Sequence, residues 1–200
     1  MNKLIVITTP SFFPDEAALL TRLFEAGMTR LHIRKPGSRR EELERLLDAI
    51  PAAYYPRVAL HDWLDIAAER GLGGIHLNRR NPEAPAAFAG TVSRSCHSLA
   101  EVETYKPSCD YLFLSPIFPS ISKEGYGSGF SLEELRAARN IIDGKVIALG
   151  GIDPERIRQL SDLPFGGVAV LGALWGSAPS LDTAESIIRQ YKRMAYELTR

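Results

Sequence analysis

The sequence has little of several features that would indicate a special class of protein. Only two of its 200 residues are cysteine, Cys96 and Cys109, and they form no C-x-x-C metal-ligand pair. Two cysteines are too few for a disulfide framework, so we expect buried thiols in a reducing, cytoplasmic compartment. The first apolar run turns polar at Thr8, well short of a signal-peptide core, and no stretch nears the roughly 20 apolar residues of a membrane span.

The chain also lacks an excess of charge of either sign. It has 24 Lys and Arg against 24 Asp and Glu, a formal net charge of +0. No overall field therefore attracts nucleic acid or an anionic membrane, and we expect a small, locally bound partner. Hydrophobic residues make up 45% and charged residues 24%, which is the composition of a folded globular protein. At this length we expect one domain, residues 1–200.

Short apolar runs rich in β-branched residues recur along the whole chain and alternate with segments of helical periodicity. The predicted strands are residues 4–8, 28–33, 57–60, 74–77, 91–95, 111–115, 146–149 and 168–171. The predicted helices include residues 17–25, 41–50, 64–70 and 99–105, and another that begins after Asp153. Eight such units indicate α/β architecture, a single closed (β/α)₈ TIM barrel.

An open doubly wound sheet is the competing architecture. That fold normally has a G-x-G-x-x-G turn after its first strand, whereas this chain continues with T-T-P-S at residues 8–11. The sequence therefore favours the barrel. The fourth crossover, residues 78–90, is rich in proline and alanine and leaves little room for a full helix.

Polar residues gather where strands of such a barrel end, which is where the active sites of these barrels lie. All four histidines fall within or just after the second to fifth strands, and other polar side chains follow the second, third, fifth and sixth. These candidate residues are His32, His61, His76 and His97, with Arg34, Asp62, Ser95 and Lys123. Any one histidine could be a structural core residue, but four at one end favour a shared pocket of acids and bases that titrate near neutral pH.

Glycines at the ends of the last two strands point to a phosphate site. Gly150 and Gly151 follow the seventh strand, and Leu171 and Gly172 end the eighth. Exposed backbone N–H groups at these positions hold phosphate in many (β/α)₈ enzymes. The long loop after the sixth strand adds Ser120, Ser122 and Lys123. We expect this loop to close over a ligand, with Ile117 and Phe118 away from solvent.

Several segments resemble the thiamine-phosphate synthase and TenI family. S-P-I-F-P-S-I-S-K at residues 115–123 is similar to the synthase signature G-P-I-F-P-T-x-T-K, residues 147–152 to its A-I-G-G-I turn and residues 167–171 to its G-V-A-V-V strand. L-H-I-R, H-D, G-I-H-L and S-C-H-S match earlier family segments in order. The resemblance covers nearly the whole chain and implies a barrel that binds a small phosphorylated substrate of the thiazole phosphate class.

The family contains two reactions. The synthase joins an aminopyrimidine diphosphate to thiazole phosphate and expels pyrophosphate with Mg²⁺, whereas TenI moves a proton on thiazole phosphate carboxylate. The resemblance to the synthase implies that Arg34 and Lys123 hold pyrophosphate, Asp62 binds Mg²⁺ and Ser95 lines the pyrimidine pocket. It also implies that Gly151 and the backbone around Gly172 hold thiazole phosphate.

Departures from the synthase pattern fall at the pyrophosphate subsite. Asn81 stands where the second Mg²⁺ ligand is Asp, His32 replaces Gln, His61 replaces Asn and Pro36 replaces a lysine. We therefore expect Mg²⁺ to bind weakly or only with substrate. These changes favour a TenI-type tautomerase, although Pro116 stands where TenI tautomerases have a proposed catalytic histidine.

In the tautomerase interpretation His97 or His32 moves the proton, and Arg34 or Lys123 holds the carboxylate. The alternatives are a synthase, a non-catalytic protein that binds thiazole or thiamine phosphate, and a phosphate-binding barrel enzyme outside thiamine metabolism. The chain could also form a homo-oligomer.

Overall fold

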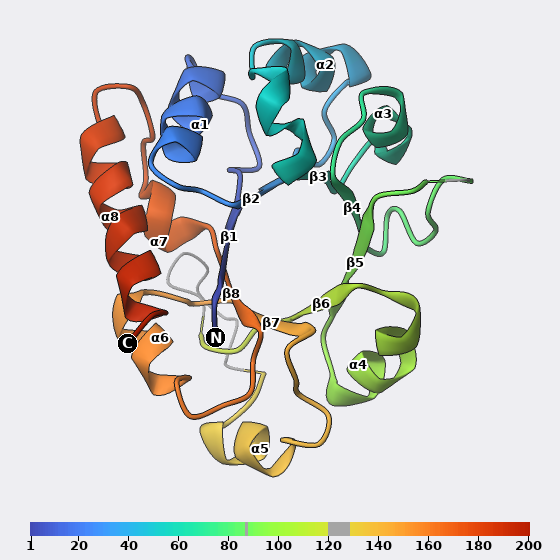
Figure 1. Ribbon diagram of the computed structural model, residues 1–200, viewed down its shortest axis with the longest axis vertical. Coiled ribbons are helices and arrows are strands. Elements are labelled where there is room, and N and C mark those ends of the chain that lie inside the picture. Colours follow the sequence, from blue (N-terminus) through green and yellow to red (C-terminus); the bar gives the residue numbers. More distant parts are fainter. Residues whose placement is uncertain (87, 120–128) are drawn as a thin grey trace.

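The structure, a computed structural model, describes residues 1–86, 88–119 and 129–200 and contains a closed parallel barrel. Its strands follow one another around the barrel in sequence order (Figure 1). They are β1 (Lys3–Ile7), β2 (Arg30–Ile33), β3 (Val58–Leu60), β4 (Gly74–Leu77), β5 (Thr91–Cys96), β6 (Tyr111–Leu114), β7 (Val146–Leu149) and β8 (Gly167–Val170). The prediction of a (β/α)₈ barrel is confirmed, and every predicted strand is present.

Helices surround the barrel and cover its outer face (Figure 1). They are α1 (Glu16–Glu25), α2 (Arg40–Asp48), α3 (Leu64–Glu69), α4 (Leu99–Tyr105), α5 (Leu132–Ala137), α6 (Pro154–Gln159), α7 (Gly172–Trp175) and α8 (Ala184–Glu197), with 3₁₀ turns η1 (Ala52–Arg57) and η2 (Lys106–Ser108). The predicted start at Asp153 is confirmed, because its side chain accepts a hydrogen bond from the Arg156 amide. None of the described helices has the length and apolar character of a membrane-spanning segment.

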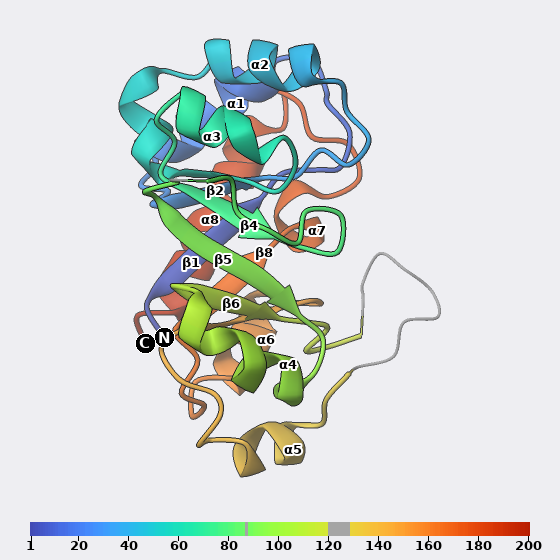
Figure 2. The same cartoon turned by 90° about the vertical axis from the view of Figure 1, so that its right-hand side faces the viewer.

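The connection between β4 and β5 has no helix in its described part, residues 78–86 and 88–90, as the proline-rich sequence predicts. It forms a loop beside the arrowhead end of β4 (Figure 2). A four-residue helix, α7, follows β8 directly and lies on the same side of the molecule. Both segments are therefore at the carboxyl end of the barrel.

The barrel interior is apolar on one side and polar on the other. Strands β1, β6, β7 and β8 contribute a buried cluster of Ile5, Ile7, Tyr111, Phe113, Ile147 and Ala169. Strands β2, β4 and β5 instead bury His32, His76 and Ser93, each with no exposed surface. Since alternate strand residues point inward, these polar side chains occupy the positions that apolar residues take on the other side. Buried polar groups require hydrogen-bond partners, so this half of the barrel is specified by a polar network.

The two cysteines are free and buried, which confirms that they are thiols within the core. Burial raises the pKa of the Cys96 thiol to about 12 and also raises the pKa of Cys109. The thiolate form is therefore disfavoured at neutral pH, and neither residue has the electropositive, accessible setting of a reactive cysteine.

Candidate active site

A cavity of about 920 Å³ lies at the carboxyl end of the barrel. Five of the residues singled out in the sequence line it: Arg34, His61, Ser95, His97 and Leu171. They come from segments that follow β2, β3 and β8 and from the end of β5. The apolar part of its lining includes Ile7, Phe113 and Leu149. The structure therefore brings the ends of strands from all around the barrel to one cavity, as the fold predicts.

Positive charge dominates this cavity. Arg34, Arg79, Arg80 and Arg94 line it, with Glu101 as the one carboxylate among the lining residues that the structure describes. The Arg94 guanidinium lies 3.9 Å from the centre of the Tyr105 ring and donates to the Pro82 carbonyl at 3.0 Å. Burial and the charge of Arg80 lower the pKa of Arg34, but a guanidinium stays charged at neutral pH. The charge of the lining therefore favours an anionic ligand.

Three of the four histidines, His32, His61 and His76, form one cluster, in which one ring nitrogen from each lies within 4.8 Å of the others. His61 Nε2 lies 2.8 Å from His32 Nδ1, and the rings of His61 and His76 stack with centroids 4.1 Å apart. His61 reaches the cavity, whereas His32 and His76 have no exposed surface and are absent from its lining. Two of the four histidines, His61 and His97, therefore line the cavity with Arg34 as expected, whereas His32 and His76 are buried outside its lining.

Burial also changes the protonation of this cluster. It lowers the pKa of His32 and His61 well below 6.5 and, together with Arg34, lowers that of His76 to about 3. The neighbouring histidines and arginines act in the same direction because they repel a further positive charge. All three imidazoles are neutral at pH 7, so the expectation that they titrate near neutral pH is wrong. The sequence does not show how deeply these three rings are buried, and burial is the main cause of their lowered pKa values.

His97 stands apart from the cluster, on the exposed rim of the cavity. Its Nδ1 lies 3.0 Å from the Ser115 carbonyl oxygen, and its backbone amide donates to Glu101 at 2.6 Å. Since a carbonyl only accepts, Nδ1 bears a proton and Nε2 is left for solvent or ligand. His97 is therefore the most accessible imidazole of the site.

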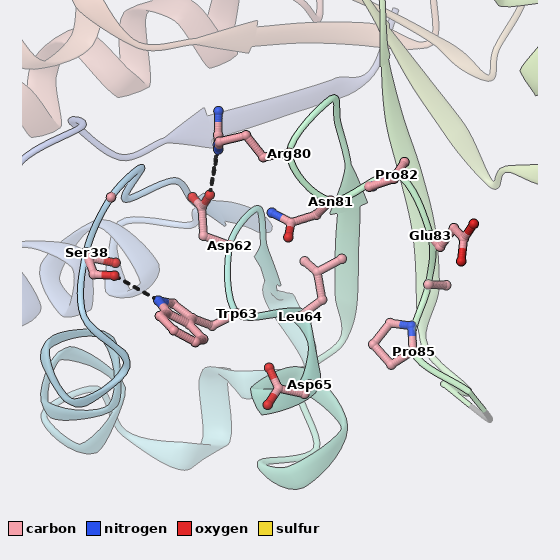
Figure 3. Close-up of a pocket in the computed structure, with 12 residues that line it drawn as sticks. Ser38, Asp62, Trp63, Leu64, Asp65, Arg80, Asn81, Pro82, Glu83 and Pro85 are labelled. Atoms are coloured by element: carbon pink, nitrogen blue, oxygen red, sulfur yellow. Dashed lines mark hydrogen bonds and ion pairs between the residues drawn. The ribbon is translucent and has the colours of Figure 1, made fainter.

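Asp62 does not form an open metal site with Asn81. Its Oδ1 accepts from Arg80 at 2.8 Å, and its Oδ2 accepts from the Lys35 amide at 3.1 Å. Asn81 donates its side-chain N–H to the His61 carbonyl. Figure 3 shows the Asp62–Arg80 pair between the β3 and β4 loops, beside Trp63 in a second cavity of about 600 Å³. A hard cation needs several free oxygen ligands, so these residues as arranged do not fit a resident Mg²⁺.

The glycine turn after β7 packs tightly against the segment after β6. Gly150 and Gly151 have φ values of +101° and +64°, and a Cβ on Gly151 would lie 2.5 Å from the Pro119 carbonyl oxygen. The amides of Gly151 and Gly172 donate to no other described residue. Leu149 and Leu171, the residues before the two turns, line the cavity. Both turns therefore lie at the mouth of the cavity, where we predicted phosphate to bind.

We expect Gly151→Ala to weaken inorganic phosphate binding by at least about tenfold, equal to about 1.4 kcal/mol. The added Cβ meets Pro119 and Phe118 at 2.5 and 2.8 Å, so the turn must shift and its amide with it. Isothermal titration with phosphate measures the effect. Gly71→Ala is the matched control, because Gly71 has a φ of +66° but open space around it. Equal affinities for the two variants would place phosphate elsewhere.

Three predicted site residues, Ser120, Ser122 and Lys123, lie outside the residues that the structure describes. Their predicted contact with substrate therefore stays a prediction. The beginning of the same loop is described, and Ile117 and Phe118 are buried as expected. Ile117 and Phe118 therefore pack in the hydrophobic core directly after β6.

Several groups that build the site are not among the residues that the sequence motifs single out. Tyr111 and Phe113 lie on one face of β6, and the two-residue alternation of a strand could have shown that both point into the barrel. The buried ion pair between Lys35 and Glu16, with Nζ and Oε1 2.6 Å apart, has no such signal. Lys35 also holds Asp62 through its backbone amide, so this pair positions the segment that carries Arg34.

Comparison with known proteins agrees with this geometry. The profile of a family described as thiamine monophosphate synthase matches residues 4–174. The chain belongs to this family. It is therefore an enzyme of the thiamine-phosphate synthase and TenI group, as the sequence motifs predict.

Individual relatives support the same assignment. Thiamine-phosphate synthase of Yersinia pestis (strain Pestoides F) is 30% identical over 172 residues, covering 80% of this chain and 79% of the relative. The synthase of Koribacter versatilis (strain Ellin345) is 31% identical over 191 residues, covering 87% and 89%. A crystal structure of thiamine phosphate pyrophosphorylase from Bacteroides thetaiotaomicron is 43% identical, covers 98% of both chains and has a TM-score of 0.89. These names favour the synthase alternative over the tautomerase that the sequence analysis preferred.

Proposed function

We propose that this chain is a thiamine-phosphate synthase, which joins an aminopyrimidine diphosphate to thiazole phosphate and releases pyrophosphate. The observation that carries the proposal is the cavity with four arginines at the carboxyl end of a family barrel. Both substrates bear phosphate, and the arginines supply the charge that such ligands require. The names of the relatives support this reaction over the others in the family.

In this proposal the arginines carry most of the chemistry. Arg34, Arg80 and Arg94 hold the diphosphate oxygens and stabilise the negative charge that develops as pyrophosphate leaves. The amides of Gly151 and Gly172 hold the thiazole phosphate, on the side of the barrel away from Arg80. The family's Mg²⁺ would supply further neutralisation of the diphosphate, but Asp62 and Asn81 do not fit a resident ion.

Hydrogen bonds from Ser93 through His76 determine whether the Ser95 hydroxyl donates to or accepts from the substrate. Ser93 donates its hydroxyl proton to the Ile75 carbonyl at 3.0 Å, so its oxygen must accept from His76 Nδ1 at 2.8 Å. His76 is neutral, hence its Nε2 accepts the hydroxyl proton of Ser95, also at 2.8 Å. Ser95 therefore presents oxygen lone pairs to the cavity, which suits a substrate N–H group.

Turnover of the two substrates tests the proposal. The purified protein should release pyrophosphate and form thiamine phosphate, and Arg34→Gln should lower kcat/KM at least about a hundredfold. Arg22→Gln, on the exposed face of α1, is the matched control and should keep full activity. Failure of the native protein to form thiamine phosphate, with Mg²⁺ present and substrates saturating, would contradict the synthase.

A second candidate function, the TenI-type tautomerase, is favoured by the buried histidines next to the cavity and by Asn81 in place of a carboxylate. Incubation of thiazole phosphate carboxylate in deuterated water, followed by NMR, measures this reaction through solvent deuterium in the product. If neither reaction occurs while both ligands raise the melting temperature, the chain is a binding protein.

We expect Mg²⁺ alone to bind the native protein weakly, because the Asp62 carboxylate is already paired with Arg80 and Asn81 is neutral. The double variant Asn81→Asp, Arg80→Gln provides two free carboxylates and should raise Mg²⁺ affinity at least about tenfold. Isothermal titration with MgCl₂ measures both proteins, and Arg80→Gln alone is the control for removal of the positive charge. Micromolar Mg²⁺ binding by the native protein would show that the ion pair does not block the site.

A further inference from the structure

A row of four hydrogen-bonded side chains crosses the barrel interior from its amino end to the cavity. Arg30 and Tyr111 are the first residues of β2 and β6, and Arg30 Nε lies 3.2 Å from the Tyr111 hydroxyl oxygen. That oxygen lies 2.6 Å from His32 Nε2, and His32 Nδ1 lies 2.8 Å from His61 Nε2. His61 lines the cavity. The reaction proposed above leaves this row without a role.

The two ends of the row fix its direction. Arginine has only donors, so Arg30 Nε–H donates to the Tyr111 oxygen. The hydroxyl proton of Tyr111 then goes to His32 Nε2, its other partner. Because His32 is neutral, its single proton is on Nδ1 and is donated to His61 Nε2. Neutral His61 consequently carries its proton on Nδ1, which makes no hydrogen bond to a described residue and is not among the fully enclosed unpaired atoms.

The amino end of the row is built to hold a guanidinium inside the barrel. Arg30 also donates to the Thr91 hydroxyl and, at 3.4 Å, to the Pro56 carbonyl oxygen. Gly74 faces it from β4, and a Cβ at that position would lie 2.1 Å from Arg30 Nη2. Any other residue at Gly74 would displace the guanidinium. The positively charged Arg30 guanidinium thus lies beside the Tyr111 oxygen and donates a hydrogen bond to it.

We propose that Arg30, Tyr111, His32 and His61 form a proton relay, in which His61 is the catalytic residue that donates to the substrate and Tyr111 supplies the replacement proton. The inference deepens the second candidate function, because a tautomerase must deliver a proton at one atom and remove one at another. His32 and Tyr111 act through His61, and Arg30 is a positioning residue for Tyr111.

The steps balance without an external acid. The His61 Nδ1–H bond breaks as the substrate takes the proton, while His61 Nε2 takes the Nδ1 proton of His32 and His32 Nε2 takes the hydroxyl proton of Tyr111. Tyr111 is left as a phenolate beside Arg30. His61 Nδ1 is now unprotonated and removes a proton from the second substrate atom, and the three transfers reverse. The substrate is isomerised and the row returns to its starting state with no imidazolium formed.

NMR of the resting protein tests the direction of the row independently of any reaction. Two-bond ¹⁵N–¹H correlations at pH 7 should show His32 and His61 as Nδ1–H tautomers. In Tyr111→Phe, which keeps the ring and removes the hydroxyl, both should become tautomer mixtures while His76 stays Nδ1–H. Tyr191→Phe is the matched control, since it removes another buried hydroxyl, one bonded to the Gly27 carbonyl and to no member of the row. An Nε2–H tautomer at His61 of the native protein would overturn the relay.

Turnover of thiazole phosphate carboxylate tests proton delivery. Tyr111→Phe should lower kcat at least about a hundredfold with little change in KM, and Tyr191→Phe should keep the native kcat. A native kcat in Tyr111→Phe would overturn the relay while leaving the tautomerase intact. If the tautomers are as expected but the product contains no solvent deuterium, the protein is not a tautomerase. The row then does not deliver protons to this substrate.

Discussion

Acidification from pH 7 to pH 5 is expected to remove about 5 to 6 kcal/mol from the free energy of unfolding. The reason is the buried cluster of His32, His61 and His76, whose pKa values are depressed in the folded protein. Each histidine that stays neutral in the fold but is protonated in the unfolded chain costs about 1.4 kcal/mol per pH unit below 6.5. Three such groups give about 4 kcal/mol per unit at the steepest part.

Stability falls on acidification because the pKa values of the three histidines are lowered in the folded protein. A lowered pKa in the folded state means that the unfolded chain binds more protons below pH 6.5. The stability is therefore complete above 6.5 and is lost as the pH falls towards the folded values, about 3 for His76. Between pH 6.5 and 5 the carboxyl groups of the unfolded chain stay largely ionised, so the histidines dominate this interval.

Urea unfolding at half-unit pH intervals measures the effect. The slope should correspond to about three protons in the native protein and about two in His76→Gln. His97→Gln is the matched control, because His97 is exposed and its removal leaves the buried cluster intact. A native protein equally stable at pH 7 and pH 5 would show that the cluster takes up protons within the fold.

The sequence predicts the barrel well because its signals are local. An apolar run bounded by turn residues marks a strand wherever it packs, and β4 and β7 have the predicted bounds, residues 74–77 and 146–149. The largest error is in β2, where Met28 packs in the core before the strand begins at Arg30. A buried apolar side chain does not require a strand, so pattern alone extends the element too far.

The candidate site was predictable in position but not in chemistry. Strand alternation and topology bring His61, Ser95 and Arg34 to one mouth. They do not tell how deep each side chain lies, and depth decides the pKa of His76. The Asp62–Arg80 pair joins two loops 18 residues apart in sequence through a side-chain contact. Such contacts depend on loop conformations that no periodicity describes.

Lys35→Met is expected to lower the free energy of unfolding at pH 7 by about 3–5 kcal/mol. Lys35 and Glu16 are 1% and 3% exposed, and Nζ lies 2.6 and 2.8 Å from the two carboxylate oxygens of Glu16. Loss of the lysine leaves a buried carboxylate without its partner, which is the costly case for a buried ion pair. Arg136→Met, which breaks an exposed pair with Asp162, is the control and should cost less than about 1 kcal/mol.

The pH dependence and a second substitution distinguish a lost charge partner from lost packing. Burial already raises the pKa of Glu16 above 4.5, against the effect of Lys35. Without the lysine that pKa rises further, and a group with a raised folded pKa contributes stability that is present at low pH and lost as the pH rises through the folded value. The difference between variant and native protein should therefore be larger at pH 8 than at pH 6.

The double variant Lys35→Met, Glu16→Leu should recover most of the loss, because two apolar side chains need no partners. A double variant as unstable as Lys35→Met would show instead that the hydrogen bond from Lys35 Nζ to the Ser11 carbonyl, 2.9 Å long, holds this segment in place.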